Sequence, residues 1–136
     1  MRTKIILRVF IGLVLLATAA GKLMDVRGFA GVLRTYEAFA EDALLPVAIG
    51  VPLAELALAL WLFSGRRMAG AAAGALAMQL VYAGWAAASV LSGLKLANCG
   101  CFGVFLARPL GWRTVLEDLV MAGLSAWLLA LARRRP

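Results

Sequence analysis

Two cysteines separated by one glycine are the residues of this chain best suited to chemistry. They lie in Asn98-Cys99-Gly100-Cys101-Phe102-Gly103, and the chain contains no other cysteine. The glycine between them can adopt backbone angles that bring the two sulfurs together. A disulfide closing so small a ring is strained and easily reduced, which is typical of exchange catalysts and not of structural crosslinks. The spacing therefore predicts a redox-active pair at Cys99 and Cys101.

The neighbours of this pair favour reactivity but leave alternatives open. Lys95 and Arg108 flank the motif, and positive charge favours the thiolate that attacks a disulfide. One alternative is a pair of inert cysteines. Another is a soft ion such as Cu(I) held by the two thiolates. A zinc site is disfavoured because zinc prefers four ligands and the chain has no histidine.

Glu55 is the third candidate for a catalytic residue. It lies well inside an apolar run, in Pro52-Leu53-Ala54-Glu55-Leu56. A carboxylate at membrane depth is costly, so we expect it to face the interior of a helix bundle. There it would relay protons for thiol chemistry or for a bound quinone, or it would only fix packing, protonated or paired with Gln79. No cofactor is required by these residues, and a quinone remains an open candidate.

Other charged residues have structural interpretations. Thr114-Val115-Leu116-Glu117 has the pattern of a helix capping box. Asp118 follows it and can line the interior of the bundle, so its role stays open. Lys22 and Asp25 are close enough in sequence to form an ion pair. Extension of the Lys22 side chain to the membrane surface is the simpler prediction.

The composition of the chain indicates whether it folds in water or in a lipid bilayer. The chain has 136 residues, of which 64% are hydrophobic and 15% are charged, whereas soluble domains are about half apolar and about a quarter charged. So short a chain cannot bury that much apolar surface in water, which argues against a soluble enzyme, a disordered chain or a disulfide-stapled secreted module. The basic residues behind the net charge of +7 lie at the ends of apolar runs. We therefore expect a lipid bilayer and no nucleic acid as the partner.

Four apolar runs are long enough to cross a bilayer as helices. They cover residues 5–24, 44–63, 68–91 and 115–132. Between the first two, apolar residues recur at helical spacing and predict a short interfacial helix (Phe29, Val32, Leu33 and Tyr36). Residues 94–113 form the one long loop, which contains both cysteines. The prediction is an all-α four-transmembrane-helix bundle in a single integral membrane domain, residues 1–136.

Charge predicts how this bundle is oriented. With both termini in the cytoplasm, the inner side carries only basic residues (Arg2, Lys4, Arg8, Arg66, Arg67, Arg133, Arg134 and Arg135), whereas the outer side mixes both signs. The positive-inside rule then places the cysteine loop outside. Arg8 interrupts the first apolar run, which favours a retained helix over a cleaved secretory signal.

With these features the chain resembles the MauE/DoxX-like family of small four-helix membrane proteins, and within it the MauE branch. The resemblance covers nearly the whole chain and is carried by Ala20-Gly21-Lys22-Leu23, Tyr36, Leu44-Leu45-Pro46, Glu55 and Cys99-Gly100-Cys101-Phe102-Gly103. It implies a bacterial inner-membrane location and a periplasmic thioredoxin-like partner. It also implies an association with maturation of methylamine dehydrogenase, and a bundle similar to the vitamin K epoxide reductase group, which couples thiols to quinone. Many members carry aspartate where this chain has Asn98.

The leading hypothesis is a membrane thiol–disulfide exchange component. In it Cys99 contacts the extracytoplasmic thioredoxin-like partner, Cys101 resolves the mixed disulfide, and Glu55 tunes the site or relays protons. One alternative is a non-enzymatic membrane subunit or anchor of a redox or maturation complex. Another is a protein that handles soft metals, Cu(I) or Hg(II). Whether the chain is an enzyme stays open among these readings.

Overall fold

The computed structural model describes residues 1–134, and Arg135 of the charge pattern lies outside them. Among the described residues there are five helices and no strand: α1 (Arg2–Leu23), α2 (Val26–Arg34), α3 (Glu41–Ser64), α4 (Met68–Leu91) and α5 (Trp112–Arg133). All but α2 are long and apolar enough to cross a membrane. The predicted all-α membrane bundle with four spans is confirmed.

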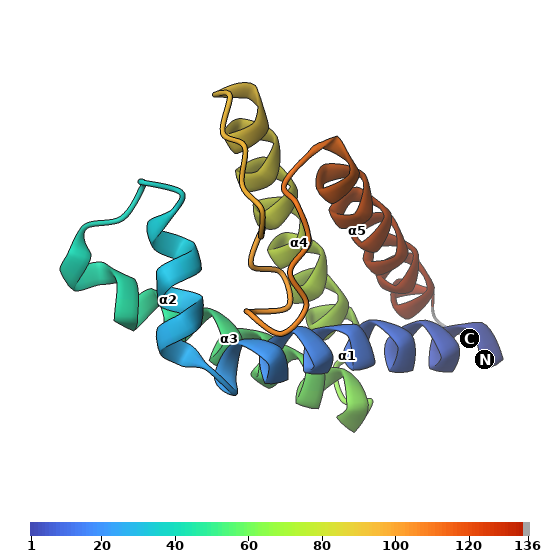
Figure 1. Ribbon diagram of the computed structural model, residues 1–136. Helices are drawn as coiled ribbons and strands as arrows, with labels where there is room; N and C mark the ends of the chain where they lie inside the picture. Colours follow the sequence, from blue (N-terminus) through green and yellow to red (C-terminus); the bar gives the residue numbers. More distant parts are fainter. Residues whose placement is uncertain (135–136) are drawn as a thin grey trace.

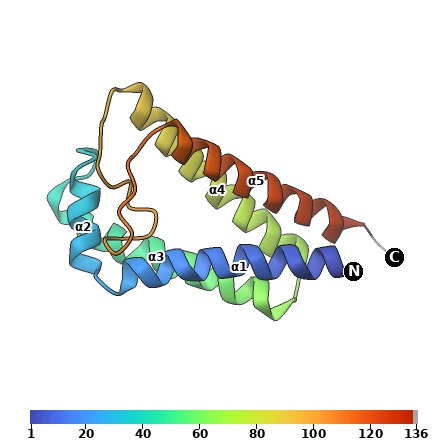
Figure 2. The ribbon, with the colours of Figure 1, turned by 45° about the vertical axis from the view of Figure 1, so that its right-hand side comes forward.

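The four long helices form two antiparallel pairs, α1 with α3 and α4 with α5. The pairs lie closest together where α1 begins and α5 ends, and they diverge toward the other end (Figure 2). The loop between α4 and α5 descends into this opening, beside α2 (Figure 1). The fold therefore has a closed end and an open end, and the cysteine loop occupies the open one.

Small side chains explain why the closed end is tight. Its core joins α1, α3, α4 and α5 and includes alanines on α4 that allow close approach of the helices (Leu7, Ile11, Leu15, Ala59, Leu62, Ala71, Ala72, Ala75 and Leu128). Many large apolar side chains point outward instead, among them Ile6, Leu13 and Leu80. An outer surface of this kind is compatible with lipid and not with water.

The short helix predicted between the first two spans is confirmed as α2. Its N-cap is Asp25, whose carboxylate accepts a hydrogen bond from the Gly28 N–H at 2.8 Å. Its apolar face packs Phe29 and Leu33 against Leu44 and other residues of α3. The carboxylate of Asp25 thus caps a helix, and the ion pair with Lys22 predicted as one option is not formed.

The capping box predicted at Thr114 and Glu117 is wrong because α5 begins earlier than expected. The helix starts at Trp112 after an extended Gly111, so Thr114 lies within the first turn. Its hydroxyl oxygen accepts a hydrogen bond from the Gly111 N–H at 3.4 Å. Glu117 instead binds the guanidinium groups of Arg108 and Arg113. This carboxylate therefore fastens the end of the cysteine loop to α5.

Candidate functional site

The cysteine loop is folded back on itself before it reaches the helices. The Cys99 N–H donates to the Arg108 carbonyl at 2.7 Å, and the Leu110 N–H donates to the Leu96 carbonyl at 3.0 Å. These two bonds join the descending and ascending arms of the loop. Residues 99–108 consequently form a tip that is carried into the opening between the helix pairs.

Two glycines allow the tip to touch α1 backbone to backbone. A Cβ atom on Gly21 of α1 would lie 2.3 Å from the carbonyl oxygen of Phe102, and one on Gly103 would lie 2.4 Å from that of Gly21. Gly103 also has a φ of +72°, a conformation that glycine adopts without strain. The Ala20-Gly21-Lys22-Leu23 and Cys99–Gly103 motifs, far apart in sequence, are therefore in contact.

The Asn98 side chain and a tyrosine hydroxyl hold the turn that contains the cysteines. The Asn98 side-chain oxygen accepts from the Gly100 N–H at 2.9 Å, and its amide nitrogen donates to the Gly103 carbonyl at 3.0 Å. The Tyr36 hydroxyl donates to the Cys99 carbonyl at 2.6 Å, and burial raises the pKa of Tyr36, which keeps it a donor. An ionised aspartate in place of Asn98 would supply only acceptors. The amide is thus matched to this turn.

The two thiols are adjacent and electronically unequal. Their sulfurs lie 2.8 Å apart, and Cys99 is only 9% exposed. A hydrogen bond from the Cys101 thiol, aided by the positive charge of Arg108, lowers the pKa of Cys99 to about 6. The same hydrogen bond, together with burial, raises the pKa of Cys101. At neutral pH the pair therefore holds one proton, on Cys101, and Cys99 is the thiolate.

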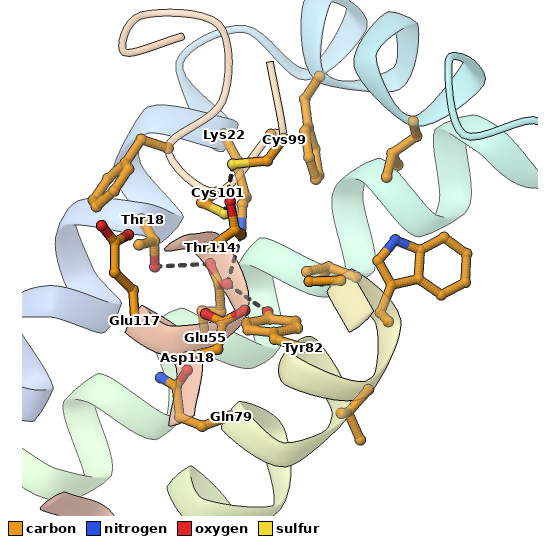
Figure 3. Close-up of a pocket in the computed structure, with 18 of the residues that line it drawn as sticks. Thr18, Lys22, Glu55, Gln79, Tyr82, Cys99, Cys101, Thr114, Glu117 and Asp118 are labelled. Carbon is orange, nitrogen blue, oxygen red and sulfur yellow. Dashed lines mark hydrogen bonds and ion pairs between the residues drawn. The ribbon is translucent and has the colours of Figure 1, made fainter. Parts of the chain in front are cut away.

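Below the thiols lies a buried ionic cluster centred on Glu55. Lys22 Nζ is 2.6 Å from Glu55 Oε1, and the Tyr82 hydroxyl donates to the same oxygen at 2.5 Å (Figure 3). Thr18 donates to the other carboxylate oxygen at 3.2 Å. Lys22 is 4% exposed and Glu55 is fully buried. An ion pair at this depth is tolerated because hydrogen bonds from α1 and α4 satisfy the carboxylate.

This cluster corrects two predictions. Glu55 is paired with Lys22 and not with Gln79, and Lys22 points into the bundle instead of extending to the membrane surface. The ammonium group lies 5.4 Å from the ring centre of Phe29 and 5.3 Å from that of Tyr82, which offsets part of its lost hydration. Opposite charges in two successive apolar runs were the sequence signal for this pair. Tyr82, the other missed partner, gave no signal beyond its place in an apolar run.

The thiols and the ionic cluster line one cavity of about 290 Å³. The three residues predicted as the site, Cys99, Cys101 and Glu55, all border it, as does Lys22. Asp118, whose role the sequence leaves open, lines it from α5. Within residues 1–134 no group of three or more cysteine or acidic side chains is arranged to hold a metal ion. The two thiols thus face a mainly apolar cavity that is also lined by the Lys22–Glu55 ion pair.

Comparison with known proteins assigns the chain to a family. Residues 2–131 match the family described as "Methylamine utilisation protein MauE". The chain belongs to the MauE family. It is 37% identical over 130 residues to the methylamine utilization protein MauE of Paracoccus denitrificans, an alignment that covers 96% of this chain and 68% of the relative. No solved structure matches the chain.

Membership of the MauE family confirms the resemblance drawn from the glycine–lysine and cysteine motifs. Together with four apolar helices it identifies a multi-pass membrane protein. The family match covers α1, which supplies Gly21 and Lys22, as well as the cysteine loop. The end of α1 with Gly21 and Lys22 and the cysteine loop thus both lie inside the segment that the MauE family shares.

The unequal thiols lead to a prediction on pH. Alkylation of Cys99 by iodoacetamide, followed by mass spectrometry, is expected to rise with pH around a midpoint near the pKa of about 6. Arg108→Gln removes a positive charge that favours the thiolate, so the midpoint moves upward by about 1 pH unit. Arg113→Gln is the matched control, since Arg113 also binds Glu117, whereas Arg108 is the cation that lowers the pKa of Cys99. Equal midpoints for the two variants would contradict the role of Arg108.

Proposed function

We propose that this MauE-family protein serves methylamine utilisation as a membrane thiol–disulfide exchange component. The observation that carries the proposal is the Cys99–Cys101 pair, whose sulfurs lie 2.8 Å apart, with the pKa of Cys99 lowered and the pKa of Cys101 raised by their hydrogen bond. A thiolate beside a protonated thiol is the arrangement that exchange requires, because one sulfur attacks and the other resolves.

The exchange proceeds in two steps. The Cys99 thiolate attacks a disulfide of the partner, forming a mixed disulfide and releasing one partner thiolate. The Cys101 sulfur then attacks Cys99, which frees the second partner sulfur, and the proton of Cys101 passes to the partner. The pair loses two electrons and becomes a disulfide, and the partner gains two electrons and, with a second proton from water, becomes a dithiol. The same steps in reverse oxidise the partner.

Glu55 has a positioning role in this proposal. Its carboxylate accepts hydrogen bonds from Lys22, Tyr82 and Thr18 and is fully enclosed. The enclosed ion pair keeps Lys22 below the tip, next to Gly21, the residue on which the tip rests. The group thus supports the cysteines without exchanging protons with them.

The partner that fits this surface is an extracytoplasmic thioredoxin-like protein. Basic residues flank the start of α1, the turn between α3 and α4 and the end of α5, so by the positive-inside rule we expect the open end to lie outside. Phe105 and Leu106 of the tip are 61% and 53% exposed and offer an apolar surface beside the thiols. Because Cys99 itself is nearly buried, formation of the mixed disulfide includes outward movement of the tip.

Trapping with single cysteine variants tests the proposal. Cys101→Ser is expected to accumulate a mixed disulfide at Cys99 with a thioredoxin-fold protein, identified by mass spectrometry after non-reducing electrophoresis. Cys99→Ser should accumulate far less, and the double variant is the control for non-specific capture. If neither single variant traps such a protein, and the native pair keeps one redox state in cells, exchange is excluded.

The same variants separate the two alternatives. A non-enzymatic anchor predicts that the Cys99→Ser/Cys101→Ser variant keeps its partners and supports growth on methylamine. A soft-metal protein predicts stoichiometric Cu(I) or Hg(II) on the purified wild type that the double variant loses. Exchange predicts loss of growth with no dependence on either metal.

A further inference from the structure

We propose that the cavity beneath the cysteine loop binds the ring of a lipid-soluble quinone, held by Gln79 and Lys22, and that this quinone oxidises the cysteine pair. The inference rests on the proposed exchange function and names the electron acceptor behind it. Four features of the cavity support it: an unused amide, an under-used ammonium group, apolar walls that reach the lipid, and direct contact with both thiols.

Gln79 is a polar side chain that has no partner in the described part of the chain. It is 4% exposed, lies on α4 and lines the cavity, yet its amide forms no hydrogen bond with any of residues 1–134. Figure 3 shows the amide turned toward the space shared by Glu55 and Asp118. Among the described residues, the side-chain polar atom that is buried without a hydrogen-bond partner is Arg8 Nε. The Gln79 amide therefore opens onto the cavity, where it can donate to an oxygen atom of a ligand.

Lys22, at the polar end of the same cavity, has N–H donors that form no hydrogen bond with the described residues. Its ammonium group carries three N–H bonds, and among the described residues only Glu55 accepts one of them. The other groups near the nitrogen are the rings of Phe29 and Tyr82, which interact through their faces. A carbonyl oxygen between Lys22 and Gln79 would receive hydrogen bonds from both. A quinone carbonyl, whose oxygen gains electron density on reduction, is the acceptor that a positive charge stabilises most.

The walls fit an apolar ring that enters from the membrane. Apart from its polar floor the cavity is lined mainly by apolar and aromatic side chains, including Val14, Leu15, Phe29 and Val51. Val81 and Trp85 line it and are also 66% and 38% exposed, so the cavity reaches the lipid-facing side of α4. A volume of about 290 Å³ is at the lower end for ligand pockets. That size suits one or two rings with the tail in lipid, and not a porphyrin or a dinucleotide.

The chemistry balances with the residues present. Oxidation of the pair forms the Cys99–Cys101 bond, releases two electrons and frees the single proton held by Cys101. Reduction of a quinone to a hydroquinone consumes two electrons and two protons. The second proton comes from water, and Asp118, half-buried on α5 and bordering the cavity, is the carboxyl group placed to transfer it. The oxidised pair then oxidises a dithiol of the partner, which fixes the direction of exchange.

A binding measurement tests the cavity independently of turnover. Protein in phospholipid nanodiscs is titrated with ubiquinone-1 by isothermal calorimetry, and we expect saturable binding of one molecule per chain. Gln79→Leu should bind about tenfold more weakly, because one buried hydrogen bond is lost. Gln79→Met serves as a second variant of similar shape. Ser89→Ala is the matched control, since Ser89 is a buried polar residue of α4 that bonds to its own helix.

A thiol titration tests the redox step. One equivalent of ubiquinone-1 should convert the reduced pair to a disulfide in the wild type and in Ser89→Ala, whereas Gln79→Leu should form less disulfide at the same quinone concentration. Absence of saturable binding, or equal binding by Gln79→Leu and Ser89→Ala, overturns the quinone site even if a thioredoxin-fold partner is trapped. Binding without oxidation of the pair overturns the acceptor role. Oxidation without any trapped partner supports the quinone site and removes the proposed exchange function.

Discussion

Lys22→Met is expected to destabilise the protein by about 3–5 kcal/mol, the cost of removing one member of a buried ion pair. Glu55 would remain fully buried with only the hydroxyl donors of Tyr82 and Thr18. The free energy of unfolding is measured from far-ultraviolet circular dichroism as sodium dodecyl sulfate is added to mixed micelles.

The double variant Lys22→Met/Glu55→Leu is the decisive comparison for this prediction. Replacing both charges with apolar groups of similar volume removes the unpaired carboxylate, so most of the lost stability should return. Lys95→Met is the matched control, because Lys95 lies on the exposed part of the cysteine loop. Should Lys22→Met unfold at the same detergent concentration as Lys95→Met, the ion pair does not stabilise the bundle.

Gly21→Ala is expected to push the cysteine tip away from α1. The new methyl group would meet the Phe102 carbonyl oxygen at 2.3 Å, and neither backbone can yield without movement of the whole tip. Overpacking of this kind costs about 1–3 kcal/mol. Displacement also separates Cys99 from Tyr36, so iodoacetamide should modify Cys99 faster at pH 8, where the thiolate dominates in both proteins.

Gly84→Ala provides the matched control for this second prediction. Gly84 lies on α4, and a Cβ atom there would meet nothing within 4 Å. Alanine favours helix over glycine, so this variant should be as stable as the wild type or more so, with Cys99 reactivity unchanged. If Gly21→Ala leaves the alkylation rate of Cys99 at the wild-type value, the contact does not hold the tip.

The fold was largely predictable because apolar runs in lipid have few alternatives. The expected spans and the helices differ mainly at their starts: α3 begins at Glu41 and α5 at Trp112, before the first residues of the apolar runs that predicted them. Those first turns contain polar and aromatic residues at the membrane boundary, which a search for apolar runs leaves out. The helix starts at the boundary therefore depend on caps and loop contacts.

The site was only partly predictable. Cys99, Cys101 and Glu55 were found because their residue types are unusual where they stand, and the structure brings them to one cavity. Lys22 was misassigned because a lysine at the end of an apolar run normally reaches the membrane surface. Its true direction depends on the rotation of α1 against α3, and the contact of Gly21 with Gly103 depends on a loop that turns inward. Neither the rotation of α1 nor the inward turn of the loop can be predicted from the spacing of residues along the chain.

The contact between the tip and α1 has a consequence for biogenesis. The ribosome releases α1 and α2 well before residues 99–103, so the surface that receives the tip already exists when the cysteines emerge. Docking can then follow as soon as α4 has inserted, before α5 is complete. A nascent chain of this kind shelters its thiols early, which shortens the interval in which they can form disulfides with unrelated proteins at the membrane surface.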